Sequence, residues 1–209
     1  MRRKHSFSFR LLIIILIIAG MLFSIQYLKQ QSMMNLNIEI VDEAGKTISK
    51  VPIRQNPLSI IFFWERGQVD ITSYVGLNRY IKVTPVVTIN VAGDTTNIIP
   101  FAMLKFTWTT ITLNNSEVQV KNAQLMSADY QIGTEVIVWV PMNQEYELNA
   151  QDIVIFIPID QLVSKIPPGQ VGELRLQCRA YVEIKSQDYS TLASKTEIGT
   201  FTCFLKNTG

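Results

Sequence analysis

The sequence predicts an all-β protein, an antiparallel β-sandwich, behind one N-terminal transmembrane helix. Three observations support this prediction. The stretch 11–28 (LLIIILIIAGMLFSIQYL) contains no charged residue. The rest of the chain is rich in Val, Ile, Thr, Phe, Tyr and Trp, which suit a pleated, half-buried surface. Several segments there alternate apolar and polar residues, as strands with one buried face do.

Residues 11–28 form the predicted membrane anchor. Eighteen residues at about 1.5 Å each make a helix of about 27 Å, which crosses a bilayer's hydrocarbon core with little tilt. Eleven of its first fifteen residues are Leu, Ile or Phe, so insertion into lipid is favourable. Only Lys29 follows it closely, whereas four basic residues precede it: Arg2, Arg3, Lys4 and Arg10. This asymmetry predicts a cytoplasmic N-terminus, with the rest of the chain across the membrane.

Two alternatives remain open for this stretch. A cleaved signal peptide would suit the basic start, but no clean site with small residues follows the apolar run. The nearest candidates, 24–26 (SIQ) and 32–34 (SMM), match such a site poorly. A buried core helix is the second alternative, although such helices are rarely apolar on all sides.

Charge is distributed unevenly along the chain. The net charge is +2, but five of the nineteen basic residues lie within positions 1–29. From position 30 onward, fourteen basic residues stand against seventeen acidic ones, a net of −3. This balance gives no reason to expect a nucleic-acid partner.

The length predicts one large or two small domains after the anchor. A change of pattern between Gly93 and Pro100 suggests a boundary, although no Pro, Gly or Ser linker marks it. The predicted organisation is a cytoplasmic basic flank, a signal anchor, an N-terminal β segment or small β domain, and a C-terminal β-sandwich. Their ranges are 1–10, 11–28, 29–99 and 100–209.

The first half contains three predicted strands and one very apolar run. Residues 36–41 alternate as a half-buried strand, 42–45 form a turn, and 46–53 return. The run 58–64 (LSIIFFW) follows Pro57. Residues 80–91 alternate again and predict another strand.

The second half gives clearer patterns. Residues 104–113 and 118–130 flank a predicted tight turn at 114–116 (NNS). Residues 135–140 (EVIVWV) predict a strand. Residues 153–159 (IVIFIPI) are apolar on both sides, so we expect both faces of this strand to be covered, with Pro158 near its end or at a bulge.

The end of the chain combines one short helix with two strands. Asp160 is the expected cap of a helix at 161–166, which 167–169 (PPG) ends. Residues 174–184 alternate most regularly, and 200–206 form the last predicted strand. One face of the regular strand is apolar: Leu174, Leu176, Cys178, Ala180, Val182 and Ile184.

Cys178 and Cys203 are the only cysteines. If 174–184 and 198–206 form a hairpin with its loop centred near Ser190, the two cysteines face each other on the apolar side. Export permits oxidation, and a disulfide closing this loop would stabilise the fold by about 3.5 kcal/mol on the chain-entropy model. The alternative is two reduced, buried cysteines.

Few residues suited to catalysis follow the predicted anchor. His5 is the only histidine and precedes it, so the exported part lacks a Ser-His, Cys-His or His-zinc site. Glu145 and Glu147 lie in a polar loop, and Asp42 and Glu43 in a turn, as solvated charges usually do. No phosphate-binding loop, dinucleotide fingerprint or EF-hand loop is present. We expect no enzymatic activity, no cofactor and no bound metal.

Two further features have ordinary and functional interpretations. Asn114-Asn115-Ser116 matches the acceptor for N-glycosylation, but such triplets are common by chance and a turn explains this one. Trp64, Trp108 and Trp139 lie in apolar strands. We expect these tryptophans in the core rather than on a sugar-stacking platform.

Four segments share a pattern with a known family. Residues 110–115 (TITLNN) stand where the family has an Asn-Pro turn, with asparagine in place of the proline, and 127–133 stand at its next segment. Residues 148–162 match an apolar strand leading to a short helix, and 172–184 the long strand after it. The arrangement covers half of the chain and resembles the late-embryogenesis-abundant type-2, or WHy, domain. The resemblance implies an immunoglobulin-like β-sandwich with a short helix, roles in stress protection or the envelope, and no catalytic residues.

Together these patterns predict a non-enzymatic, single-pass membrane protein with its β domain outside the cytoplasm. It would be an envelope, stress-protection or membrane-complex accessory module, with the lipid bilayer contacting 11–28 and a protein partner or a second copy contacting the domain. An alternative is a surface-filament or envelope-lattice subunit that assembles by β-strand addition. The run 58–64 is a candidate for the exchanged segment, although a place in the core is the default expectation for it. A carbohydrate-processing enzyme would instead need two carboxylates across a groove.

Overall fold

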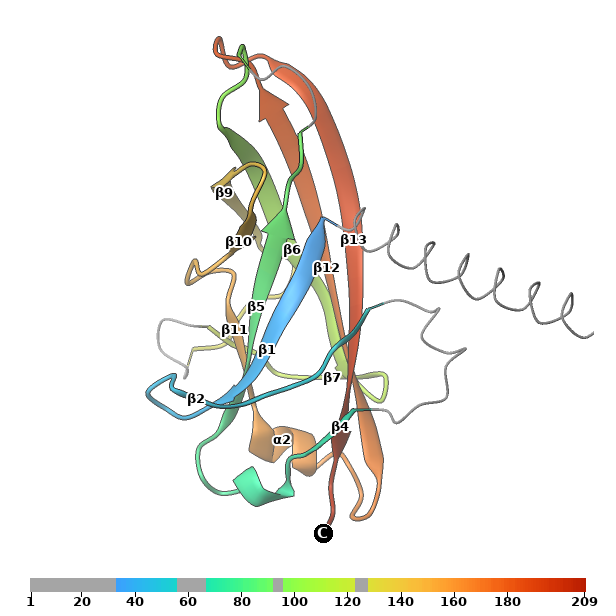
Figure 1. Cartoon of the computed structure of the whole chain (residues 1–209). Helices are drawn as coiled ribbons and strands as arrows, with labels where there is room; N and C mark the ends of the chain where they lie inside the picture. The colour runs from blue at the N-terminus through green and yellow to red at the C-terminus, as the bar shows by residue number, and fades with distance from the viewer. Residues whose placement is uncertain (1–32, 56–66, 92–95, 123–127) are drawn as a thin grey trace, which may run out of the picture. The chain divides into compact units, whose positions relative to one another are not determined.

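The computed structural model describes residues 33–55, 67–91, 96–122 and 128–209. Within these ranges, Met34–Gly209 form one compact unit of strands with a single short α-helix (Figure 1). No helix in the described ranges is both long and apolar enough to cross a membrane. The predicted anchor, its basic flank (Arg2, Arg3, Lys4 and Arg10) and the apolar run 58–64 lie outside the described residues.

The first sheet contains six strands, all antiparallel to their neighbours. Its order is β2 (Thr47–Lys50), β1 (Met34–Val41), β5 (Tyr80–Thr88), β11 (Ile155–Pro158) and β8 (Lys121–Asn122), and β10 (Glu145–Glu147) pairs with β5. The predicted strand at 36–41, its turn and its return are therefore confirmed as β1 and β2.

The second sheet contains seven strands and is mixed, because one of its pairings is parallel. Its order is β3 (Arg54–Gln55), β13 (Thr191–Lys206), β12 (Val171–Lys185), β6 (Phe101–Leu113) and β7 (Ser116–Glu117). Two more strands join it: β4 (Gln68–Asp70) runs parallel to β13, and β9 (Glu135–Pro141) pairs with β6.

The two sheets face each other across an apolar core. The Sδ atom of Met34, on β1, lies 3.9 Å from the Sγ atom of Cys178, on β12. The indole N–H of Trp108, on β6, donates a 2.8 Å hydrogen bond to the carbonyl of Ile153, just before β11. The apolar face predicted for β12 is confirmed, since five of its residues are buried: Leu174, Leu176, Cys178, Ala180 and Val182.

The apolar strand β11 is covered on both faces, as its sequence predicts. It lies between β5 and β8, and its residues 155–157 are all buried. On the side away from the second sheet, Phe156 packs with Val41 and Val154, and Tyr80 covers this cluster with its ring edge-on to Phe156. Pro158 is the last residue of β11, where the missing N–H breaks no central pairing.

The predicted hairpin around 114–116 forms only in part. β6 and β7 flank the turn, but β7 is two residues long, and the chain then crosses to the first sheet as β8. The long strand expected at 118–130 is therefore wrong. Val118 and Val120 are buried, as alternating residues of a strand would be. The alternation in the sequence therefore follows the burial of these side chains, although no long strand among the described residues pairs with this segment.

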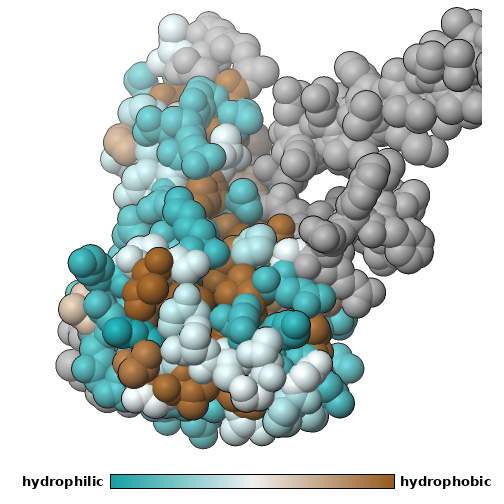
Figure 2. Space-filling model, turned by 60° about the horizontal axis from the view of Figure 1, so that its bottom comes forward, coloured by the Kyte–Doolittle hydropathy of each residue, from teal (hydrophilic) through white to brown (hydrophobic). Residues whose placement is uncertain are grey.

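The short helix is α2 (Ile159–Val163), and it begins earlier than 161–166. The predicted cap is wrong: Pro158 occupies the N-cap position, and Asp160 lies in the first turn. The Asp160 carboxylate instead accepts a 2.8 Å hydrogen bond from the Gly76 N–H, just after the 3-10 turn η2 (Thr72–Tyr74). Apolar and polar side chains are interspersed at this end of the unit (Figure 2).

Strands from both sides of residue 100 share both sheets. β5 pairs with β10 and β11, and β4 pairs with β13. The sequence allows the segment before residue 100 to form either a separate small domain or additional strands. In the described residues, this segment supplies additional strands to the same unit.

Candidate functional site

The β12–β13 register differs from the prediction for the two cysteines. Cys178 lies opposite Gly199, and Cys203 lies opposite Leu174. This offset of four residues separates the two cysteines by about 13 Å along the strands, whereas a disulfide needs Cα atoms within about 7 Å. Both thiols are free and buried, so the predicted disulfide does not form. Burial raises the pKa of each thiol to about 12, which leaves both unreactive at neutral pH.

The turn at the end of this hairpin explains the error. The Tyr189 N–H donates to the Ser186 carbonyl, and the Ser186 N–H donates to the Ser190 carbonyl, each at 2.9 Å. The loop is therefore centred near Asp188 and not near Ser190. When the centre of the loop shifts by two residues, the residue that lies opposite any given position changes by four. Because four is an even number, the same side chains still face the core.

The predicted solvated carboxylates lie at separate places. Glu145 and Glu147 are exposed on β10. The Asp42 carboxylate accepts hydrogen bonds from two backbone N–H groups of its own turn, at 3.0 and 2.9 Å, and Glu43 is exposed beside it. The described residues contain no cluster of three or more His, Cys, Asp or Glu that could hold a metal ion.

The tight turn at Asn114 and Asn115 is confirmed. Both residues have left-handed backbones, with φ of 50° and 65°, and Leu113 pairs with Ser116 across the turn. Asn114 is exposed, and its side-chain oxygen accepts a 2.8 Å hydrogen bond from the Glu173 N–H. Its glycosylation stays a prediction.

The tryptophans divide between the core and the surface. Trp108 is fully buried, as predicted, whereas Trp64 lies outside the described residues. The core prediction is wrong for Trp139, whose side chain is 45% exposed. Trp139 lies on β9, at the side of the second sheet, and points away from the core because its neighbour Val140 points inward.

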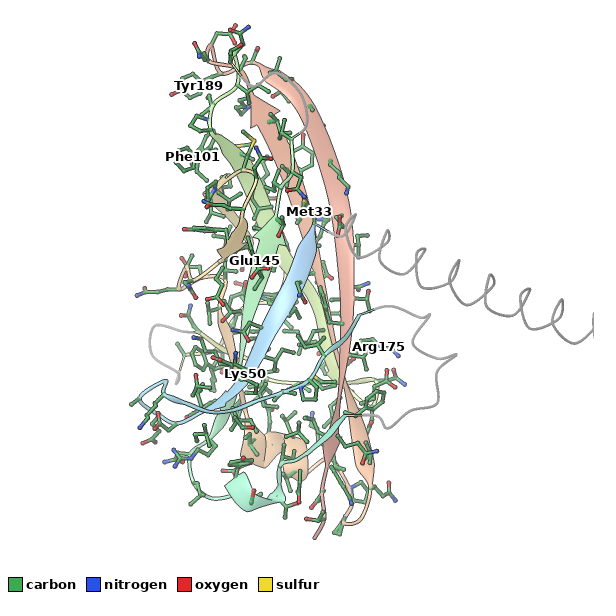
Figure 3. The ribbon with its side chains drawn as sticks, in the orientation of Figure 1. Met33, Lys50, Phe101, Glu145, Arg175 and Tyr189 are labelled. Atoms are coloured by element: carbon green, nitrogen blue, oxygen red, sulfur yellow. The ribbon has the colours of Figure 1, made fainter. Side chains whose placement is uncertain are left out.

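Trp139 belongs to an exposed apolar cluster on the outer face of the second sheet. Met103 of β6 lies directly opposite it, and Phe101 and Ile137 are two residues away on the same face of their strands. The side chain of Phe101 is 45% exposed and that of Ile137 is 55% exposed. Figure 3 labels Phe101. We call these four residues, Phe101, Met103, Ile137 and Trp139, the β9 patch.

Charged side chains border the β9 patch. Lys105, which lies opposite Ile137, extends its ammonium group over the Tyr181 ring at 5.6 Å from the centroid. Glu183, which lies opposite Met103, forms an ion pair with Lys185, with 2.7 Å between Oε2 and Nζ. An apolar patch with a polar rim is typical of a surface that binds another molecule.

The β9 patch adjoins an open strand edge. Within the described part of the chain, β9 pairs with β6 alone, so its other edge offers backbone N–H and C=O groups to a further strand. Contact with another chain would thus combine main-chain hydrogen bonds with burial of Ile137 and Trp139.

The sequence contains one signal for this surface. Residues 136–140 are five consecutive apolar residues, so both faces of this strand are apolar. Whichever face meets the core, the other face presents apolar side chains on the outside of the sheet. The run 153–157 has the same pattern but lies inside its sheet. The pattern alone does not distinguish a strand covered on both faces from a strand at the edge.

Comparison with known proteins adds no relative. No family model, no curated protein and no solved structure matches this chain.

Proposed function

We propose that this chain is a non-enzymatic, single-pass membrane protein whose β domain binds a protein partner outside the cytoplasm. Residues 11–28 would anchor it, with the N-terminus in the cytoplasm. The observation that carries the interaction role is the β9 patch beside the open edge of β9. Three of its four side chains are large, apolar and well exposed, and burying them against a partner would be favourable.

The proposed domain is an immunoglobulin-like or WHy-like β-sandwich. Two facing sheets with a shared apolar core support this proposal, and so does the succession of β11, α2, β12 and β13. This order agrees with the apolar strand, short helix and closing strand pair of the family that the sequence resembles. An envelope or stress-protection role would follow from that family.

A surface-filament or lattice subunit is the second candidate. The open edge of β9 favours it, because the same edge could pair with a strand of another copy. The two candidates use one surface and differ only in the identity of the occupant.

Photo-crosslinking in native membranes tests both candidates. A benzophenone amino acid at Ile137 places the reactive group in the β9 patch, and the same group at Thr47, exposed on β2 in the other sheet, is the control. We expect an adduct with a different protein from position 137 and none from position 47. Adducts at multiples of the chain's own mass would support the filament, and no adduct from position 137 would overturn both.

A pair of substitutions tests the patch itself. Trp139→Thr should abolish the adduct formed from position 137, because it removes the largest apolar side chain of the surface. The matched control is Ile198→Thr, which removes a 63% exposed apolar side chain from β13, on the opposite side of β12 from β6. We expect the control to keep the adduct, and an equal loss from both variants would count against the β9 patch.

A further inference from the structure

Tyr189 stands at the tip of the β12–β13 hairpin. Its side chain is 68% exposed, the largest fraction among the large hydrophobic side chains of the described residues. Figure 3 labels it at one extreme end of the unit. An aromatic ring in this place contributes nothing to the apolar core.

The backbone of Tyr189 is strained. Its φ is +66°, in the left-handed region that bulky L-residues rarely adopt. It follows a turn closed by its own N–H on the Ser186 carbonyl, and hairpins of this kind normally carry glycine at that position. Glycine or asparagine would make the same backbone bond with less strain. The tyrosine ring is therefore kept at a cost to the turn, as side chains at binding sites often are.

The hairpin extends well past the start of β1. Met34, the first residue of β1, packs beside Gly199, and Gly199 lies opposite Cys178. From Cys178, β12 continues for seven residues to Lys185, a rise of about 23 Å. We call this part of the hairpin, residues 179–198, the arm. Along this arm, residues 191–196 of β13 are exposed on both faces. In Figure 1 the hairpin runs beyond the start of β1 together with β6, and residues 97–99 bond to 185–187 next to the turn that holds Tyr189.

The length of chain before β1 limits how far this arm can lie from an anchor. From Leu28 to Met34 there are six residue steps, which span at most about 22 Å in any conformation. An arm that rises by about 23 Å before its turn therefore meets the bilayer surface when it points along the membrane normal. Tyrosine is enriched at that depth, because its ring is apolar and its hydroxyl is polar.

The charges near the tip favour no particular lipid headgroup. Asp188 is acidic, and Lys185 is already paired with Glu183 at 2.7 Å. Lys195 is likewise paired with Glu197, at 3.1 Å. An arm without unpaired cations among these residues has no electrostatic preference for anionic lipid.

We propose that the tip of the β12–β13 hairpin docks on the surface of the lipid bilayer through Tyr189. This inference rests on the proposed anchoring by 11–28. The tip is a second membrane contact, and it fixes the tilt of the β domain and hence the direction in which the β9 patch faces.

Spin-label accessibility on the full chain tests this docking. The chain is reconstituted in phosphatidylcholine vesicles with a nitroxide on Leu192→Cys, near the tip, or on Glu43→Cys in the β1–β2 turn. The two native thiols are buried and stay unlabelled. Oxygen concentrates in lipid, whereas a polar nickel chelate is excluded from it. We therefore expect the ratio of the label's accessibility to oxygen over its accessibility to the nickel chelate to be higher at 192 than at 43. Adding phosphatidylglycerol should leave this ratio unchanged.

Two variants identify the ring as the cause. Tyr189→Asn keeps a residue that tolerates the left-handed backbone, so it should raise the unfolding temperature while the ratio at 192 falls to that at 43. Tyr146→Asn removes a 41% exposed tyrosine from β10 and should leave the ratio unchanged. Equal ratios at 192 and 43 in the unmodified chain, an unchanged ratio in Tyr189→Asn, or docking only with phosphatidylglycerol would overturn the inference.

The anchor is tested separately by flotation of the vesicles after a carbonate wash. A chain that fails to float refutes the anchoring of the proposed function. A chain that floats while residue 192 reports water refutes the docking of the tip alone.

Discussion

Two tryptophans on the second sheet contribute to different properties of the protein. Trp108 donates its indole N–H to the Ile153 carbonyl at 2.8 Å inside the core, whereas Trp139 is exposed. We expect Trp108→Phe to lower the free energy of unfolding by about 1–3 kcal/mol, because a buried carbonyl loses its partner. Urea unfolding in detergent measures this change. Trp139→Phe is the matched control and should shift stability by less than about 0.5 kcal/mol, and equal effects would contradict the burial of Trp108.

Gly199 shows how closely the two sheets approach each other. A Cβ atom there would lie 2.6 Å from the Phe201 ring and 3.2 Å from the Met34 Cε. We expect Gly199→Ala to destabilise the fold by about 1–3 kcal/mol through overpacking. Thermal unfolding measures the loss, and Ser194→Ala, at an exposed position of the same strand, should leave the midpoint nearly unchanged.

At the scale of elements, the hairpin turn depends on an ionised carboxylate. The Asp188 side chain accepts hydrogen bonds from the Ser186 and Ser190 hydroxyls and from the Ser190 N–H, and these lower its pKa. A pKa lowered by folding stabilises the folded state above the unfolded pKa of about 3.9, and this contribution is lost as the pH falls below it.

The substitution Asp188→Asn isolates that contribution. We expect the unmodified chain to melt above the variant at pH 6, and the difference to shrink as the pH drops below about 4. Melting curves across this range measure it. A difference that grows in acid would show that the ionised carboxylate destabilises the turn.

The same turn shows where prediction from sequence fails within an element. The alternation of β12 identified its buried face correctly, because burial follows the side-chain period of two. The pairing of Cys178 depended on the loop centre, which the hydrogen bonds of Asp188 and the left-handed Tyr189 decide. The alternation of apolar and polar residues carries no information about those hydrogen bonds. Tyrosine is also an unexpected residue at a left-handed turn position, which glycine usually occupies.

At the scale of the whole molecule, the all-β class, the two-sided burial of 153–157 and the turn at Asn114 were predictable from local pattern. The edge position of β9 was not, because it depends on which strands come to lie beside it in space. The sequence pattern therefore predicts Trp139 in the core, although it lies in the β9 patch. The candidate surface exists because the apolar strand β9 lies at the edge among the strands that the structure describes.

The shared sheets predict that the C-terminal half does not fold alone. Residues 100–209 include β11 but lack its neighbour β5, and they include β13 but lack β3 and β4. We expect this fragment to give broad amide resonances and no cooperative melting, whereas 33–209 should unfold in one transition. A cooperative transition in the shorter fragment would restore a domain boundary near residue 100.

The position of β13 bears on how the protein is made. It is synthesised after the other described strands, yet it lies inside its sheet, between β12 on one side and β3 and β4 on the other. At about 5–20 residues per second, the 120 residues between β4 and β13 take about 6–24 seconds to synthesise. Throughout that interval β3 and β4 lack the strand with which they pair, so the second sheet cannot be completed before β13 has been synthesised.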